Sequence, residues 1–220
     1  LSFDSYIGYQ EIPKHLNVLN LKEYGEHKNT RSDLSIVERD PYFIRTDLLG
    51  EGTDWQDELF TKALVQSYNL SASGGSDKST YYMGIGYLNQ DGIAIGSGFD
   101  RLNLSSNLDS QVKDYFKVGL NFALNNSKQT TTVSDQSLIL TALKQTPNVA
   151  VRNAEGSFDG PDTDQFVQNN PIGLANINDN HNENIGIRAS TFGEITFTKG
   201  LTFKTQYSLN YGFTNDYTFN

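Results

Sequence analysis

The stretch that decides the fold is residues 116–125, which read FKVGLNFALN. Alternate positions there fall into two sets: Phe, Val, Leu, Phe and Leu on one parity, and Lys, Gly, Asn, Ala and Asn on the other. Because strand side chains point alternately to opposite faces, this strand has one apolar face and one small, polar face. A membrane-spanning β-barrel is one of the few environments in which long strands carry that division.

The same alternation predicts seven strands in the chain. They are expected at residues 1–10, 63–74, 79–89, 99–111, 115–128, 184–198 and 200–217. Several of them exceed the ~5–6 residues that are usual for strands of globular proteins. Short turns are expected at 74–78, 112–114 and 198–200, and longer connections at about 11–62, 90–98 and 129–183. Tight turns at one end of the strands and long loops at the other are the layout of an outer-membrane barrel.

Two short helices are predicted inside the long loops, at Leu19–Lys28 and Ser134–Lys144. The second has Leu138, Ile139, Ala142 and Leu143 at helical spacing and a proline beyond its end. We interpret both helices as packing elements of large loops.

Composition excludes several classes of function. The chain has 17 basic and 26 acidic residues, a net charge of −9, which argues against a nucleic-acid partner because phosphate binding requires a basic surface. It has no cysteine, so disulfides and cysteine-based metal sites or nucleophiles are absent. The mean hydropathy of −0.51 does not exclude the membrane, since a barrel strand is apolar only at every second position. The chain starts and stops within expected strands, and we interpret it as a fragment of a longer protein.

A soluble β-sandwich also has one apolar face per strand, so alternation alone leaves both architectures open. The polar faces, rich in Gly, Ser, Thr and Asn, suit a hydrated lumen. Tyr81 and Tyr87 bracket one apolar face, and the six residue steps from one to the other span ~20 Å at ~3.3 Å per residue. That length is close to the ~25 Å apolar band between the aromatic girdles of a barrel. These details favour the barrel.

Several motifs are similar to those of the SusC-like (SusC/RagA) family of TonB-dependent outer-membrane transporters of Bacteroidetes-type bacteria. They are GTDWQDELF at 52–60, NLSASGGSDKSTYY at 69–82, GYLNQDG at 86–92, NLDS at 107–110, FKVG at 116–119, and YIGYQ at 6–10 with IPK at 12–14. The similarity covers most of residues 1–128 and is looser beyond them.

The resemblance implies an all-β fold: a partial transmembrane antiparallel β-barrel with long extracellular loops that contain short helices. Such barrels have about 22 strands and a plugged lumen. Residues 1–220 would be the N-terminal part of the barrel, about its first seven strands just after the plug domain, with the long loops at about 11–62 and 129–183. The plug and the rest of the barrel are not in this chain.

The same resemblance implies import of oligosaccharides, or of peptides, across the outer membrane by an active transporter. The partners it implies are a SusD-like surface lipoprotein, outer-membrane lipid, and the TonB complex, which would bind a preceding region that this chain lacks. No cofactor and no catalysis are expected. The alternative is a soluble or surface-attached β-sheet module, either carbohydrate-binding or an adhesin. A third hypothesis, an outer-membrane enzyme, would require a Ser/His/acid constellation that the sequence does not display.

Two groups of residues are candidates for the functional site. Loop residues that would contact a ligand or partner are Tyr42, Trp55, Asp159, Asp162, Asn178 and Asn180. Residues expected to face the lumen are Arg101, Asn103, Lys117, Asn121, Arg188 and Glu194. Because Trp55 lies in the motif 52–60, we favour a structural anchor of the loop over stacking on a sugar ring. The alternative for each lumen residue is that it only hydrates the wall and pairs with its neighbours.

Metal binding is not expected at the histidines. His15, His27 and His181 lie far apart in sequence and lack zinc-motif spacing, so we interpret them as ordinary loop histidines. The acidic run 159–164, with Glu155 before it, is interpreted as a solvated turn, with calcium binding through its oxygens as the alternative.

Seven strands cannot close around so large a lumen. We therefore expect that the isolated 220-residue chain does not fold stably in water without detergent. A cooperative thermal transition of the detergent-free chain would contradict this expectation.

Overall fold

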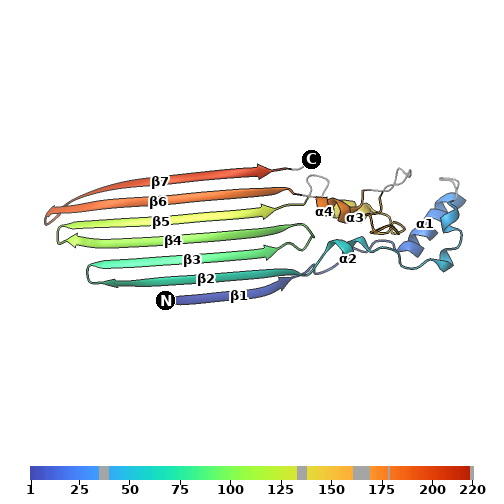
Figure 1. Ribbon diagram of the computed structural model, residues 1–220, viewed down its shortest axis with the longest axis horizontal. Helices are drawn as coiled ribbons and strands as arrows, with labels where there is room; N and C mark the ends of the chain where they lie inside the picture. Colours follow the sequence, from blue (N-terminus) through green and yellow to red (C-terminus); the bar gives the residue numbers. More distant parts are fainter. Residues whose placement is uncertain (35–39, 133–137, 161–168, 178, 219–220) are drawn as a thin grey trace.

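Seven antiparallel strands form one sheet in which each strand pairs with its neighbours in chain order (Figure 1). The structure, a computed structural model, describes residues 1–34, 40–132, 138–160, 169–177 and 179–218. The strands are β1 (Ser2–Gln10), β2 (Ala63–Ser76), β3 (Ser79–Asp91), β4 (Gly98–Lys113), β5 (Phe116–Thr130), β6 (His181–Thr198) and β7 (Leu201–Tyr217). The sheet is open, because β1 and β7 each have one neighbour. The all-β antiparallel prediction is confirmed, and the seven described strands do not close on themselves.

Most strands extend one to three residues beyond their predicted ends. The main difference is at β6, predicted from residue 184, which begins at His181. His181 pairs with Thr130 on one side and with Tyr217 on the other. Backbone pairing therefore continues past the point where the apolar alternation ends, because a ladder needs only main-chain donors and acceptors.

The register places apolar residues beside apolar residues across the sheet. One continuous row consists of Phe3, Leu70, Ile85, Leu104, Leu124, Ile187 and Tyr211. Directly opposed residues of antiparallel strands point to the same face, so the apolar halves of all seven strands combine into one continuous apolar face. The tight connections 77–78, 114–115 and 199–200 lie at one end of the strands, and the longer ones lie at the other.

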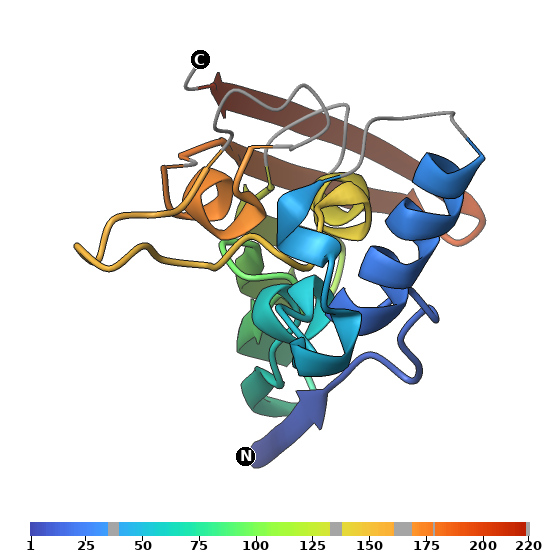
Figure 2. The ribbon, with the colours of Figure 1, turned by 90° about the vertical axis from the view of Figure 1, so that its right-hand side faces the viewer.

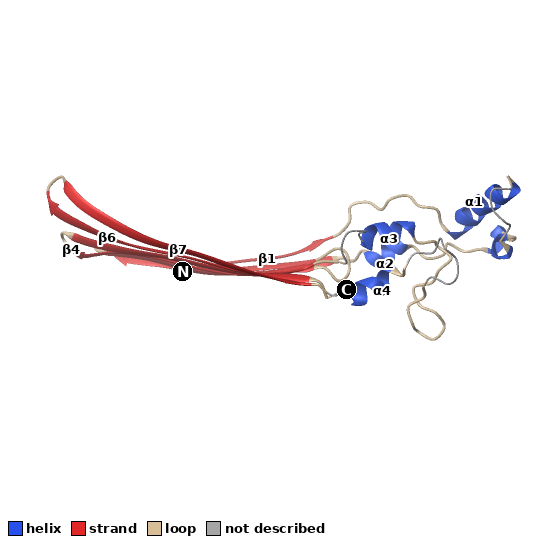
Figure 3. Ribbon diagram, turned by 90° about the horizontal axis from the view of Figure 1, so that it is seen from above, coloured by secondary structure: helices blue, strands red, loops and turns tan. Residues whose placement is uncertain are grey.

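The helices lie beyond the end of the sheet that carries the long connections (Figure 3). They are α1 (Leu21–Asp33), α2 (Trp55–Leu59), α3 (Leu138–Lys144) and α4 (Pro171–Ile177), with two short 3-10 helices, η1 (Pro41–Phe43) and η2 (Thr46–Leu48). Of these, α1 was expected at 19–28 and α3 at 134–144, of which residues 134–137 lie outside the described part. None of the described helices has the length and apolar character required to cross a membrane.

The start of α1 follows from a capping box. The Asn20 side chain accepts a hydrogen bond from the Glu23 amide, and the Glu23 carboxylate accepts one from the Asn20 amide. Two otherwise unpaired donors at the start of the helix are satisfied in this way. The helix therefore begins at Leu21, and it continues to Asp33, five residues past the predicted end.

The described parts of the two long connections, residues 11–62 and 131–180, are called the loop module here. Viewed along the strands, this module lies in front of the strand ends (Figure 2). Its core consists of Trp55, Leu59, Leu138, Ala142, Val149, Ile172 and Ala175. These residues come from α2, α3, α4 and the segment after α3, so the two connections share one hydrophobic core.

Candidate functional site: a polar sheet face and a loop module

The six residues predicted to face the lumen lie on one face of the sheet. Arg101 and Asn103 share a parity on β4, and Asn103 opposes Asn125 on β5. Lys117 and Asn121 have the parity of Asn125, and on β6 Glu194 opposes Lys117. The sixth residue, Arg188, has the parity of Glu194. This face is opposite the apolar face, since successive strand residues point to opposite sides.

A shallow hollow of about 530 Å³ lies on this polar face, across β4 to β7. Its polar lining consists of Ser105, Asn107, Asn121, Arg188, Ser190, Ser208 and Asn210. Asn121 donates a hydrogen bond to the Ser190 hydroxyl at 3.3 Å. The lining also contains the apolar residues Phe122, Ala123, Ala189 and Leu209. Its amides and hydroxyls can both donate hydrogen bonds to a ligand and accept them, whereas the Arg188 guanidinium can only donate.

Nearer the tight turns, the polar face carries an aromatic ring that the alternation did not predict. Phe192 lies on this face, and the Lys204 ammonium lies 4.2 Å from its ring centroid. A Cβ at the neighbouring Gly119 would lie 2.0 Å from the ring, so only glycine leaves room for it there. Phe192 was not predicted here because the other residues of this face of β6 are mostly polar or small. Gly119, directly opposite on β5, could have indicated it, since a glycine in a strand often marks a close approach by another group.

Trp55 anchors the loop module. It begins α2, whose N-cap residue Asp54 accepts hydrogen bonds from the amides of Gln56 and Asp57. Its side chain is 3% exposed, and its indole Nε1 donates to the Thr146 carbonyl at 3.1 Å. The Thr53 hydroxyl adds a bond to the Val149 carbonyl at 2.7 Å. This burial leaves little of the ring for a sugar and favours the structural anchor, the interpretation that the sequence also favoured.

The other candidate loop residues do not form one cluster with Trp55. Tyr42 is 55% exposed in η1, and its ring contacts Phe43 edge-on. Asn180 is buried just before β6. The Asp159 carboxylate accepts from the Gly160 amide, and its carbonyl accepts from the Asn170 side chain.

Asp162 and Asn178 lie outside the described residues, as does most of the acidic run 159–164. The contacts of Tyr42, Asp159 and Asn180 with a ligand or partner stay predictions.

An exposed ion pair lies at the far side of the module. The Arg45 guanidinium donates two hydrogen bonds to the Asp47 carboxylate, at 2.8 and 2.5 Å. These bonds, together with the guanidinium charge, lower the pKa of Asp47 from its usual value. The pair lies in the turn before α2 without burying charge, and exposed pairs of this kind contribute little to stability.

Gln56 is a further residue that sequence reasoning missed. Its buried amide accepts a hydrogen bond from the Leu16 amide at 2.9 Å and donates one to the Leu16 carbonyl at 2.8 Å. The backbone amide and carbonyl of Leu16 are therefore both hydrogen-bonded to the side chain of a residue in α2. The two residues are 40 positions apart, so no local pattern in the sequence could have shown this contact.

Comparison with known proteins identifies the family. No protein-family model matches the chain. TonB-dependent receptor P3 of Formosa agariphila is 33% identical over 170 residues, which is 72% of this chain and 16% of the relative. TonB-dependent receptor SusC of Bacteroides thetaiotaomicron is 29% identical over 129 residues, 58% of this chain and 12% of SusC. The chain belongs to the SusC-like family of TonB-dependent receptors. The family predicted from the motifs is therefore confirmed.

Solved structures show the same fold. The RagAB peptide importer in its open-open state matches with a TM-score of 0.73 at 19% identity, over 96% of this chain and 27% of that one. The described sheet is thus a part of a SusC-like barrel. The chain spans about a sixth of the length of the curated receptors that it matches.

Proposed function

We propose that this SusC-like segment forms part of the wall and two of the outer loops of an outer-membrane importer. The proposal rests mainly on the division of the sheet into two faces. One face is apolar across all seven strands, and the opposite face is polar. In this proposal the apolar face contacts lipid and the polar face, with Arg101, Asn121 and Arg188, lines the lumen. The long connections then project to the cell exterior, because the tight turns of such barrels face the periplasm.

Import would be driven by TonB and would require a SusD-like lipoprotein on the outer side, with oligosaccharides as cargo and peptides as the alternative. The receptors P3 and SusC support TonB dependence by their names. The amides and hydroxyls that line part of the hollow support a hydroxyl-rich cargo, because they match the groups of a sugar. The RagAB match, by contrast, is to a peptide importer.

The orientation can be tested with a matched pair of cysteines, since the chain itself contains none. Leu120 and Asn121 are consecutive in β5 and point to opposite faces. In the full receptor in its membrane, we expect a water-soluble maleimide to label the Asn121→Cys variant and to spare the Leu120→Cys variant. Equal labelling of the two variants, or preferential labelling at position 120, would overturn the assignment of the faces.

Transport can be tested by filling the hollow. We expect Asn121→Trp to reduce uptake of the cargo at an unchanged amount of receptor in the membrane. Leu120→Trp, one residue away on the lipid side, is the matched control and should transport normally. Growth of a receptor-deletion strain on pooled oligosaccharides and on pooled peptides separates the two cargo classes. Undiminished growth of the deletion strain on both would contradict the proposed import.

A further inference from the structure

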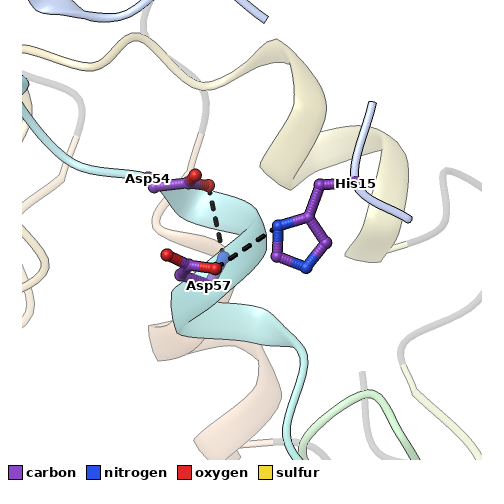
Figure 4. A group of neighbouring side chains, drawn as sticks. All are labelled: His15, Asp54 and Asp57. Carbon is purple, nitrogen blue, oxygen red and sulfur yellow. Dashed lines mark hydrogen bonds and ion pairs between the residues drawn. The ribbon is translucent and has the colours of Figure 1, made fainter. Parts of the chain in front are cut away.

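Three side chains with metal-ligand chemistry meet at the base of the loop module. His15, Asp54 and Asp57 each place one ligand atom within 4.8 Å of the other two (Figure 4). The Nδ1 atom of His15 lies 3.3 Å from Oδ1 of Asp57. His15 belongs to the 11–20 segment that follows β1, whereas both aspartates belong to the start of α2. The sequence places His15 about 40 positions before them, so spacing alone gives no sign of the group.

The scaffold holds these residues together without the help of an ion. Leu16, the neighbour of His15, has its amide and its carbonyl bonded to the buried Gln56 side chain. Gln56 lies between Asp54 and Asp57 in α2. The His15 ring also lies 6.2 Å from the Phe60 ring, measured between centroids. The backbones that carry the three side chains are therefore fixed relative to one another, which lowers the entropy cost of assembling a site.

The charges of this group favour a cation. Among the described residues, His15 is the one basic side chain within ion-pair distance of Asp57. Asp54 uses its Oδ1 atom to cap α2, accepting from the amides of Gln56 and Asp57 at 2.9 and 3.2 Å. Two carboxylates thus face one imidazole at a surface position. A bound cation would offset their mutual repulsion.

The donor set indicates which cation. Imidazole nitrogen suits zinc and its transition-metal neighbours, whereas Ca²⁺ and Mg²⁺ select oxygen ligands alone. With Zn–N and Zn–O bonds of about 2.0–2.2 Å, two ligand atoms on a tetrahedral ion lie about 3.4 Å apart. The observed separation of 3.3 Å between Nδ1 of His15 and Oδ1 of Asp57 is close to this value, and the ligand atom of Asp54 lies within 4.8 Å of both. Three protein ligands leave a fourth position for water, as in open zinc sites.

We propose that His15, Asp54 and Asp57 bind a divalent cation of the zinc type, which joins the 11–20 segment to α2. The ion would link the chain leaving β1 to the helix that carries the anchor Trp55, and so would stiffen the loop module against the barrel wall. The proposal stands apart from the proposed transport, because it depends on the geometry of the loop module alone.

Zinc affinity of the full receptor in detergent tests the proposal, measured by competition with a chromogenic chelator. We expect His15→Gln and Asp57→Asn each to weaken Zn²⁺ binding by about tenfold or more. Asp57 is suited to the test because its side chain is 71% exposed, so its replacement leaves the core intact. Asp54→Asn should also weaken binding while still capping α2, since Asn and Asp are equivalent N-caps.

His181→Gln is the matched control. Asp179 lies 3.3 Å from its Nδ1 atom and Glu183 lies 3.9 Å from its Nε2 atom, so the two carboxylates cannot share an ion with one ring nitrogen. We expect this variant to bind Zn²⁺ as the parent does. Zn²⁺ should also slow amide hydrogen exchange in residues 11–20 of the parent and of His181→Gln, and leave His15→Gln unchanged.

Three outcomes would overturn the proposal. The first is equal Zn²⁺ affinity in the parent and all three ligand variants, which would mean an adventitious ion only. The second is loss of binding in the aspartate variants with His15→Gln unaffected, because the imidazole would then not be a ligand. The third is tighter binding of Ca²⁺ than of Zn²⁺ by the parent. None of these outcomes depends on transport, so failure here leaves the proposed function to its own tests.

Discussion

The sheet and the loop module bury their apolar residues in opposite ways. In β7, Leu209 and Tyr211 are 48% and 54% exposed, and Leu120 in the middle of β5 is 44% exposed. In the module, Leu59 is fully buried and Trp55 is 3% exposed. The sheet is one layer thick, so its apolar face needs an apolar surrounding, whereas the module surrounds its own core. One chain therefore contains a wall suited to lipid and a small core suited to water.

The two regions are also held together by different forces. Adjacent strands are joined by long backbone hydrogen-bond ladders, from nine residue pairs between β1 and β2 to 17 between β6 and β7. In lipid each unpaired backbone group costs several kcal/mol, so this ladder is what permits the wall to exist there. The module depends instead on the burial of a few side chains, each contributing about 1.5–3 kcal/mol. Substitutions should therefore act by different mechanisms in the two regions.

The largest effect is expected at the centre of the module. Trp55→Ala removes a buried ring and the hydrogen bond to the Thr146 carbonyl, and should cost about 3–5 kcal/mol of local stability. Hydrogen exchange in α3, measured on the full receptor, should rise accordingly. Leu48→Ala is the control, since Leu48 is 72% exposed in η2 and its truncation should change exchange little. Equal effects of the two variants would mean that the module has no core of its own.

The next effect concerns the wall. Leu120→Arg should cost ~2–4 kcal/mol if the residue faces the middle of the bilayer. Asn121→Arg, on the polar face, should cost far less, because a lumen-facing guanidinium stays hydrated. Unfolding of the full receptor from lipid vesicles by denaturant measures both. A cost below about half a kcal/mol at position 120 would argue against lipid contact there and would remove the contrast between the two faces.

A smaller effect is expected where the module joins its last helix. Asn170 caps α4 by accepting from the amides of Ile172 and Gly173, and it donates to the carbonyls of Val151 and Asp159. Asn170→Ala leaves these buried and half-buried groups without the Asn170 side chain, at a cost of about 1–3 kcal/mol. Faster exchange confined to α4 and the 151–160 loop would bear this out. Asn153→Ala is a comparison in an exposed turn, and its effect should be smaller.

The sheet could be predicted from the sequence because its information is local. Alternation in 116–125 and in the other strands gives both the faces and, through the turn residues, the register. The six lumen candidates share a face for the same reason. The start of α1 could also be predicted from the sequence, because Asn20 and Glu23 have the spacing of a capping box. The helix begins at Leu21, two residues after the expected start at Leu19.

The module could be predicted only in part, because its contacts join residues that are far apart in sequence. The Trp55–Thr146 hydrogen bond spans 91 positions and the Gln56–Leu16 pair spans 40. Helix α2 is five residues long, too short for a helical period to appear. Helix α4 was not predicted either, although its seven residues equal the length of the predicted α3. The sequence features that could have indicated these helices are their N-cap residues, Asp54 and Asn170. His15 was interpreted as an isolated loop histidine because only the fold brings it to Asp57.

The smallest effect is expected at the surface ion pair of the module. The hydrogen bonds from Arg45 are the main cause of the lowered pKa of Asp47, and the guanidinium charge adds to them. A lowered carboxyl pKa stabilises the folded state above the carboxyl's usual pKa of about 3.9, and this contribution disappears as the pH falls through the folded-state value. Above pH 5 the pair should therefore give no pH dependence.

Carboxyl NMR titration of the receptor with labelled aspartate should show Asp47 titrating below an ordinary aspartate, and Arg45→Gln should return it to the usual range. Because both side chains are more than 60% exposed, the thermal midpoint at pH 7 should stay within error in the variant. A clear drop in the thermal midpoint would show that the Arg45–Asp47 pair stabilises the module more than is usual for an exposed ion pair. In that case Arg45 would have to be counted among the residues that stabilise the module, although its side chain is exposed.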